Sequence, residues 1–454
     1  MITFPRFALA RPVRQLHSPK SLCWIAAILL LLIPKAHGQE YQELYSFGRN
    51  PDGNIPMGEL VEGDDGNFYG TTYYGGPSDC GTVFKITPGG ALTIIAALDG
   101  SWGRNPCYSL VKANDGNFYG TTYEGSVFRV TPNGTITYLD ATVAPAGSFI
   151  QGTDGYIYGA LAENSSSYGW VFRSSLDWST GAILHEFTWD RAGQDGIDPE
   201  GGLIQGRDGS FYGTTSLDGA YGCGTVYKIT SQGQLTTICS FLSTNGARYP
   251  YGSLLQASDG NFYGAADGGG SGTLFKASPT GALSTIYEFV GIDNTGEDPN
   301  GSLIQGNDGN LYGTARSGTS NNLGTVFKVT PSGTVTAVLA FTGSGGRYPG
   351  ANPYAGLVQG SDGNLYGTTG NSGTHGSGNV FRIIMPGPQL NSFRFGQQFV
   401  VSWRTNYVGY QLEGTIDPQF GSWSAVTNAP TLFGGQFFIT NSIGPGSRFF
   451  RLKK

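Results

Sequence analysis

The amino-acid sequence predicts an all-β protein: a seven-bladed β-propeller closed by its N-terminal strand, followed by a small C-terminal β-sandwich. Three observations predict this fold. A unit of about fifty residues recurs seven times along the chain. Each unit reads as four short strands with turn residues between them, and the seventh unit lacks a fourth strand that the N-terminal segment can supply.

Each unit carries three landmarks in a fixed order. A Pro stands four residues before a large apolar residue, an Asp-Gly turn precedes an aromatic strand, and a Gly-x-Val-Phe-Lys-like strand follows. The phrase DGNFYGTT occupies Asp65–Thr72 and returns unchanged at Asp115–Thr122. Looser copies begin at Asp154, Asp208, Asp259, Asp308 and Asp362. Units repeated in this way predict a propeller in which each copy forms one blade.

Within a unit, the local signals are those of strands. The clearest copy has apolar runs at Leu203–Ile204, Phe211–Thr215, Thr225–Thr230 and Leu235–Phe241, and no window shows a sustained helical period. Asp-Gly forms the first connection and Pro-x-Gly or Gln-Gly the third, which predicts two tight hairpins per blade. The mid-strand aromatic residues, such as Phe68, Tyr69 and Phe84, are predicted to pack between blades.

The N-terminal segment is predicted to complete the last blade. The seventh unit stops after Val380–Ile383, whereas YQELYSF at Tyr41–Phe47 matches the fourth-strand pattern LSTIYEF at Leu283–Phe289. Pairing these two ends would remove an exposed sheet edge.

The chain is predicted to have three parts, residues 1–38, 39–385 and 386–454. The first reads as a secretory signal peptide, because basic residues precede the apolar run Trp24–Ile33 and Ala36-His37-Gly38 supplies a cleavage site. No later stretch has the roughly 20 apolar residues that a transmembrane helix needs. The last part is predicted to be the sandwich, an attachment or sorting module. Its expected strands are Phe399–Trp403, Gln411–Gly414, Gln436–Ile439 and Phe449–Leu452.

Net charge argues against some classes of partner, and the cysteine content allows disulfides. Without the five basic residues of the signal peptide, 21 basic residues stand against 32 acidic ones, a net charge of −11. This sign argues against nucleic acid or an anionic membrane as partner. Cys80, Cys107, Cys223 and Cys239 remain, and we expect Cys80–Cys107 and Cys223–Cys239 disulfides or, alternatively, free buried thiols.

The loops divide into two faces with different properties. In a four-stranded meander, the short first and third connections lie on one face, while the long, variable second and blade-to-blade loops lie on the other. A rigid scaffold carries function on variable loops, so any binding site is predicted on the second face. Aromatic and Arg side chains there are the candidate ligand-binding residues. They are Arg49, Trp102, Arg104, Trp189, Arg191, Arg248, Tyr249, Arg347 and Tyr348.

Two other chemistries have weaker support. Seven turn aspartates could suggest calcium, but one carboxylate per turn is thin coordination and Asp-Gly alone explains the hairpin. We therefore predict no metal and no cofactor. Acidic residues on the variable loops could pair for glycosidic bond cleavage, although nothing fixes their separation. These residues are Asp195, Asp198, Glu200, Glu297 and Asp298.

The phrases DGNFYGTT and GTVFKITP, in this order, resemble the Gloeobacter and Verrucomicrobia (GloVer) tandem-repeat proteins over residues 41–385. The tail from FVVSWRTNYVGYQLEG to FFRLKK looks like C-terminal modules of exported proteins in those bacteria. The resemblance implies a secreted or bacterial cell-surface protein with an anchoring or sorting module. It implies no established catalytic activity.

A looser resemblance connects the repeat to virginiamycin B lyase-like and sensor-type propellers. The lyase pattern has Thr-Glu after its aromatic pair and uses His and Glu with magnesium. The matching positions here are Thr71-Thr72 and Thr121-Thr122, and after residue 38 the only histidines are His185 and His375. This departure argues against lyase chemistry.

The sequence therefore favours a secreted or cell-surface, non-enzymatic binding or adhesion scaffold whose partner is a glycan or a surface protein. The alternatives are a polysaccharide-directed hydrolase or lyase, and a purely structural surface protein. An enzyme requires converging carboxylates or a metal site, whereas a scaffold requires only exposed aromatic and Arg patches.

Overall fold

The computed structural model describes most of the chain after residue 38. The described residues are 39–48, 51–140, 147–162, 167–189, 195–242, 246–291, 295–387, 390–395, 398–404, 411–415, 423–427, 430–433, 436–442 and 449–453. The predicted signal peptide, Arg49 and Arg191 lie outside them. Within these ranges no helix is long and apolar enough to cross a membrane.

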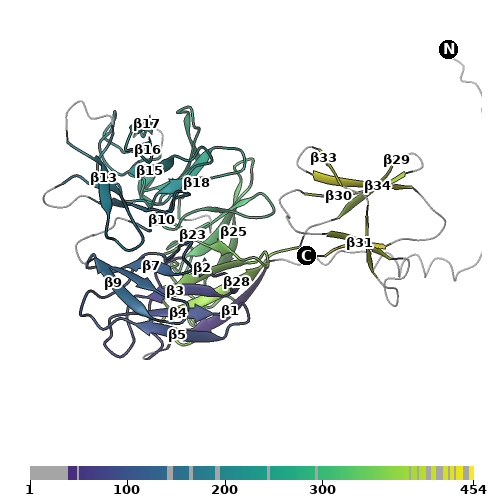
Figure 1. Ribbon diagram of the computed structural model, residues 1–454. Coiled ribbons are helices and arrows are strands. Elements are labelled where there is room, and N and C mark those ends of the chain that lie inside the picture. The colour runs from purple at the N-terminus through teal and green to yellow at the C-terminus, as the bar shows by residue number, and fades with distance from the viewer. Residues whose placement is uncertain are drawn as a thin grey trace, which may run out of the picture. The chain divides into compact units, whose positions relative to one another are not determined.

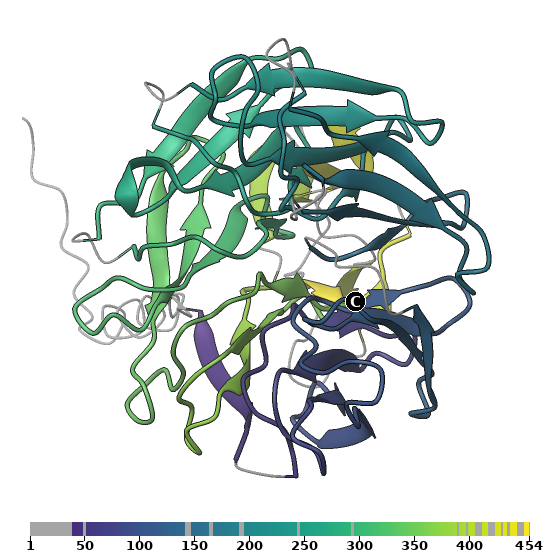
Figure 2. The ribbon, with the colours of Figure 1, turned by 90° about the vertical axis from the view of Figure 1, so that its left-hand side faces the viewer.

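Residues 39–384 form seven four-stranded antiparallel sheets, numbered here 1 to 7 (Figures 1 and 2). Sheet 1 contains β2 (Val61–Glu62), β3 (Phe68–Thr72), β4 (Thr82–Ile86) and β5 (Leu92–Ala97); sheet 2 contains β6 (Val111–Lys112), β7 (Phe118–Thr121), β8 (Val127–Val130) and β9 (Ile136–Asp140); sheet 3 contains β10 (Ile150–Gln151), β11 (Ile157–Leu161), β12 (Trp170–Ser174) and β13 (Gly181–Glu186). Sheet 4 contains β14 (Ile204–Gln205), β15 (Phe211–Thr215), β16 (Thr225–Ile229) and β17 (Leu235–Ser240); sheet 5 contains β18 (Leu255–Gln256), β19 (Phe262–Ala266), β20 (Thr273–Ala277) and β21 (Leu283–Glu288). Sheet 6 contains β22 (Ile304–Gln305), β23 (Leu311–Ala315), β24 (Thr325–Val329) and β25 (Val335–Ala340); sheet 7 contains β26 (Val358–Gln359), β27 (Leu365–Thr369), β28 (Asn379–Ile384) and β1 (Glu40–Ser46).

The N-terminal strand β1 completes the last sheet, as predicted. It pairs antiparallel with β28, with Tyr41 opposite Ile383 (Figure 1). The side-chain amide of the buried Asn379 donates to the Tyr41 hydroxyl over 3.1 Å and to the Glu43 carboxylate over 2.9 Å. Phe47, which follows β1, is fully buried, and its ring centroid lies 5.3 Å from that of Phe84 in sheet 1.

The apolar core lies between neighbouring sheets. A Tyr on the second strand of one sheet stacks on an aromatic residue of the next, with centroids 4.1 Å apart for Tyr69 and Phe118 and 4.3 Å apart for Tyr212 and Phe262. Tyr366 of sheet 7 meets Phe68 of sheet 1 in the same way, at 4.0 Å. Buried clusters span each consecutive pair of sheets and also sheets 7 and 1. The predicted inter-sheet role of the mid-strand aromatic residues is confirmed.

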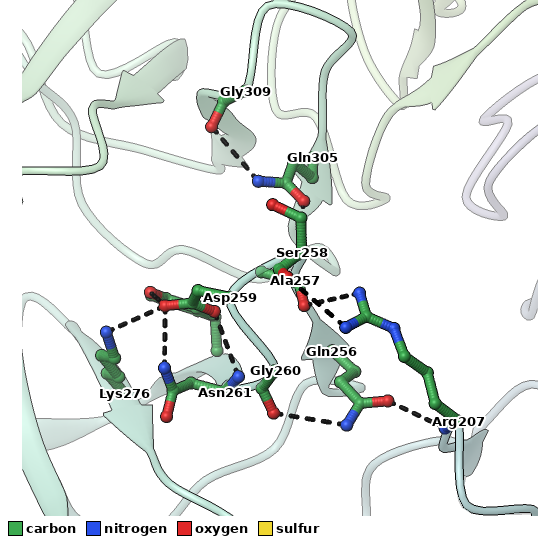
Figure 3. Close-up of polar contacts among 11 residues, drawn as sticks. Arg207, Gln256, Ala257, Ser258, Asp259, Gly260, Asn261, Lys276, Gln305 and Gly309 are labelled. Carbon is green, nitrogen blue, oxygen red and sulfur yellow. Dashed lines mark hydrogen bonds and ion pairs between the residues drawn. The ribbon is translucent and has the colours of Figure 1, made fainter. Parts of the chain in front are cut away.

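The turn aspartates hold the first hairpin of each sheet. Asp259 accepts the Asn261 amide N–H over 3.1 Å, the Tyr263 hydroxyl over 2.8 Å and the Lys276 ammonium over 3.0 Å (Figure 3). Burial alone would raise the pKa of Asp259, but these donors outweigh it and lower the pKa to about 2. The other six turn aspartates accept the same amide and Tyr hydroxyl. Among the described residues, no group of three or more His, Cys, Asp or Glu side chains could hold a metal ion.

A Gln three residues before the turn Asp links neighbouring sheets. The Gln256 carbonyl accepts the Arg207 N–H of sheet 4 over 3.0 Å, and its amide donates to Gly260 in its own turn over 3.3 Å. Gln305 repeats this with Ser258 and Gly309 (Figure 3). Where Lys112 replaces Gln in sheet 2, its partner in sheet 1 is Asp64. The Glu62 carboxylate of sheet 1 accepts the Ser361 N–H of sheet 7, so the series also links the last sheet to the first.

The C-terminal residues form two further sheets. One has the order β29 (Asn391–Phe395), β30 (Gln398–Arg404), β34 (Gln436–Ser442) and β33 (Thr431–Phe433). The other has the order β32 (Ser424–Ala425), β31 (Gln411–Thr415) and β35 (Phe449–Lys453). Val401, Trp403, Leu412 and Ile439 form a buried cluster that both sheets share. The four predicted strands are present, whereas β29, β32 and β33 were not predicted.

Candidate functional site

The segments that enter the first strand of each sheet line a cavity of about 780 Å³, together with Tyr123 and Ala162, which follow the second strands of sheets 2 and 3. Each segment begins at the repeated Pro, and all seven sheets contribute to the wall. The lining residues are Met57, Gly58, Glu59, Cys107, Tyr108, Ser109, Tyr123, Gly147, Ser148, Ala162, Glu200, Gly202, Tyr251, Gly252, Ser253, Asn300, Gly301, Ser302, Tyr354 and Ala355. These segments end the blade-to-blade loops, so the cavity opens among the variable loops.

Small residues allow the wall segments to pack side by side. A Cβ atom on Gly58 would lie 2.7 Å from the Tyr108 carbonyl oxygen, and one on Gly301 would lie 2.4 Å from the Gly356 nitrogen. Hydrogen bonds join neighbouring segments, since the Glu59 N–H donates to the Ser109 hydroxyl over 2.9 Å. The wall is therefore closely packed. Its chemical variety comes from the position directly after the Pro and from Glu59, Tyr108 and Tyr123.

Four tyrosines line the cavity: Tyr108, Tyr123, Tyr251 and Tyr354. Burial is the main cause that raises the pKa of Tyr108, to about 12, and it also raises the pKa of Tyr251. Tyr123 is 71% exposed, and its ring centroid lies 6.3 Å from that of Tyr73. The cavity lining thus combines half-buried phenols with the exposed ring of Tyr123.

Two carboxyl groups also face the cavity. Partial desolvation of Glu200 raises its pKa to about 7, with further contributions from the charge of Asp198 and a hydrogen bond to that side chain. Burial raises the pKa of Glu59, although hydrogen bonds from Ser302 and the Gly356 N–H, the latter 3.2 Å long, oppose the shift. Among the described residues that line the cavity there is no Lys, Arg or His.

Comparison with known families identifies the repeat. The Gloeobacter/Verrucomicrobia repeat matches three overlapping stretches, residues 34–144, 123–295 and 248–408, which together span most of the chain. This chain belongs to the Gloeobacter/Verrucomicrobia repeat family. No curated protein sequence matches it.

Solved structures similar to this Gloeobacter/Verrucomicrobia repeat protein are propeller-type proteins. The extracellular domain of a protein assigned as a hybrid two-component system from B. thetaiotaomicron aligns with a TM-score of 0.50 and 11% identity, over 89% of this chain and 55% of that one. A gluconolactonase from Xanthomonas campestris aligns with a TM-score of 0.40 and 14% identity, over 61% and 85% of the two chains. TolB from Acinetobacter baumannii aligns with a TM-score of 0.33 and 15% identity, over 62% and 57%. The similarity to the extracellular domain concerns the fold alone.

The sequence-predicted ligand residues of this repeat protein that the structure describes lie outside the cavity lining. Trp102 is 54% exposed and stacks on Tyr138 with centroids 6.3 Å apart. Arg104 pairs with Glu124 over 2.7 Å. Trp189 is 60% exposed, with its ring 6.1 Å from that of Tyr168. Each of these side chains has its own local partner.

The Arg-Tyr-Pro motifs have a local structural role. The Arg248 guanidinium lies 5.5 Å from the ring centroid of Tyr249, and that of Arg347 lies 5.4 Å from the ring centroid of Tyr348. Tyr348 also packs edge-on against Tyr41 of β1, at 5.6 Å. Each Arg thus contacts its own neighbour, a cation–π contact that stiffens the loop before the Pro.

The predicted disulfides are absent from the structure, which has all four cysteines as free thiols. Cys80 packs in the core between sheets 1 and 2, whereas Cys107 lines the cavity, so these two thiols occupy different environments. Cys223 and Cys239 both contact the core between sheets 4 and 5 but remain unbonded. Cys80 and Cys223 are buried, and Cys107 and Cys239 are half-buried.

The predicted acidic residues are spread over several contacts. Asp298 pairs with Arg316 over 3.3 Å, and Asp195 lies 3.6 Å from the His185 imidazole. Only Glu200 lines the cavity. A sequence signal for this site does exist, because the residue after each repeated Pro varies widely, whereas the next position is Gly or Ala in every unit except the second, where it is Tyr108.

Proposed function

We propose that this protein is an extracellular, non-enzymatic binding scaffold that holds a glycan in the tyrosine-lined cavity. The seven sheets form a closed seven-bladed propeller around that cavity, and residues 386–454 form a β-sandwich that attaches or sorts the protein. The observation that carries the proposal is the cavity of about 780 Å³ with four tyrosines in its wall.

The inter-sheet contacts support closure. Tyr366 and Phe68 pack between sheets 7 and 1 as the equivalent aromatic pairs do elsewhere. Glu62 and Ser361 make the corresponding polar contact. A continuous series of this kind leaves no first or last sheet with an uncovered face.

The lining suits a sugar. Flat aromatic rings offer apolar faces to the C–H groups of a pyranose, while Ser, Asn and Glu side chains offer partners for hydroxyl groups. Asn300 and Ser253 supply such polar groups in the wall, close to Tyr251 in the same lining. A pocket of several hundred Å³ with a few polar groups is the usual form of a small-ligand site.

The hydrogen-bonded pair Asp198 and Glu200 is unsuited to glycosidic cleavage. Glu200 and Asp198 hydrogen bond to each other. The two carboxyl groups of a glycosidase flank the bond and stand roughly 5–9.5 Å apart. Two carboxyl groups that hydrogen bond to each other leave no room between them for the glycosidic bond or for the attacking water.

An extracellular location agrees with the predicted signal peptide. The match to the extracellular domain of the B. thetaiotaomicron protein is consistent with such a location, since that domain has a similar fold.

Tyr108→Ala and Tyr251→Ala each weaken glycan binding at least about tenfold, because each removes a ring from the cavity wall. The measurement is titration calorimetry with the best ligand from a polysaccharide array. Tyr221→Ala is the matched control, since Tyr221 is a 59% exposed loop tyrosine outside the cavity lining and its loss leaves affinity unchanged.

The same titration tells a ligand site in the cavity from one on the outer loops, which are the loops that carry Trp102 and Trp189. If Trp102→Ala and Trp189→Ala abolish binding while both cavity variants bind normally, the site lies on the outer loops and the proposal is wrong. Release of shortened sugar from any bound glycan would contradict the non-enzymatic role.

A further inference from the structure

We propose that the cavity selects ligands with a positively charged amine and that, among glycans, it prefers sugars with a free amino group over neutral or N-acetylated sugars. This inference rests on the proposed glycan-binding function and names the chemical class within it.

The tyrosine rings of the cavity wall can attract a cation. A cation is attracted to the face of an aromatic ring within about 6 Å of its centroid, and several rings around one space form an aromatic cage. Tyr108, Tyr123 and Tyr251 come from sheets 2 and 5 and line the same space. Tyr354 already takes a cation in this way, since the Arg316 guanidinium lies 5.8 Å from its ring centroid.

The carboxyl groups of the cavity carry the charge opposite to that of an ammonium group. Two carboxyl groups, Glu59 and Glu200, line the cavity, and Asp198 is bonded to Glu200. No Lys, Arg or His is among the described lining residues. The Arg316 guanidinium lies beside the cavity, over Tyr354, and pairs with Asp298 over 3.3 Å. An ammonium group entering the cavity would meet carboxylate and ring faces, whereas a uronate or a sulfate would meet like charge.

The protonation of Glu200 makes the binding of a cation depend on pH. Because desolvation and the neighbouring Asp198 raise its pKa to about 7, the Glu200 carboxyl changes its protonation state near neutral pH. Asp198, Tyr108 and Tyr251 are the titratable groups whose interaction with it is resolved. A nearby ammonium favours the ionised carboxyl and lowers the pKa of Glu200, so binding releases a proton and tightens as pH rises through 7. A neutral sugar has no such dependence.

The experiment uses two sets of probes with the full chain. Glucosamine, N-acetylglucosamine and glucose oligosaccharides of equal length are titrated at neutral pH, and the glucosamine oligomer binds at least about tenfold more tightly. Tetramethylammonium, whose charge does not change with pH, is titrated from pH 5.5 to 8.5, and its affinity rises several-fold through pH 7.

Two variants test the residues. Glu200→Gln removes the rise with pH and most of the preference for glucosamine, while Tyr108→Leu weakens tetramethylammonium binding by removing a ring. Glu288→Gln, at the exposed end of β21 and outside the cavity lining, changes neither property.

The outcomes separate this inference from the proposed function. If neutral and amino sugars bind equally and both depend on Tyr251, the glycan site stands and the preference for a cation is wrong. If tetramethylammonium binds as described but no sugar does, the cation site stands and the glycan function fails. If no probe binds, both are wrong.

Discussion

Deletion of residues 39–47 yields a protein that aggregates or fails to fold at room temperature. Without β1, the whole long edge of β28 is exposed, including the buried Phe381 and Val380, which pair with β1 residues. An unpaired apolar edge of this length is a template for association with other chains. The measurement is the fraction of soluble, folded protein by circular dichroism and size-exclusion chromatography.

Single substitutions in and next to β1 measure how much this segment contributes to the free energy of unfolding. Phe47→Ala removes a fully buried ring that packs on Phe84 and lowers the free energy of unfolding by about 3–5 kcal/mol. That is a large part of the 5–15 kcal/mol typical of a domain. Glu40→Ala, at the exposed start of β1, stays within about 0.5 kcal/mol of the parent. A soluble, cooperatively folding deletion variant would show that β1 is dispensable.

Gly313→Val lowers the free energy of unfolding by about 3 kcal/mol, because β23 has no room for a side chain at this position. A Cβ atom there would lie 2.6 Å from the Phe327 ring and 2.7 Å from the Leu303 side chain. The equivalent glycines in the other sheets meet the same crowding from an aromatic ring, as Gly70 does with Phe84. This explains the Gly of the repeated Phe-Tyr-Gly phrase in terms of packing.

Urea unfolding measures this effect, with Gly345→Ala as the control. Gly345 is exposed, and a Cβ atom there would meet nothing within 4 Å. The control therefore leaves the unfolding midpoint unchanged, while Gly313→Val lowers it at a similar m-value. Equal midpoints for the two variants would contradict the packing argument.

The strands of the repeat could be predicted because their signals are local. Phe211–Thr215 was predicted and found without change of boundary, since turn residues bound it on both sides. The pairing of β1 with β28 followed from comparing one incomplete unit with the others. The short C-terminal strands β32 and β33 lack both repeats and alternation, so they carry no comparable signal.

The candidate site could not be predicted in the same way. Its tyrosines come from units far apart in the chain, and only their assembly places Tyr108 and Tyr251 in one cavity. The loop residue Arg248 was predicted to bind ligand, but it is half-buried and its guanidinium lies over the ring of the next residue, Tyr249. The Gln contacts between sheets could not be predicted, because a Gln beside a turn has no distinctive local pattern.

Hydrogen exchange of the full chain, with and without saturating glycan, tests the central claim most directly. A ligand in the cavity slows exchange in the segments after the repeated Pro, above all 107–109 and 251–253, while the loops around Trp102 and Trp189 exchange as before. Protection confined to those outer loops, with no change at 107–109 and 251–253, would contradict a site in the tyrosine-lined cavity.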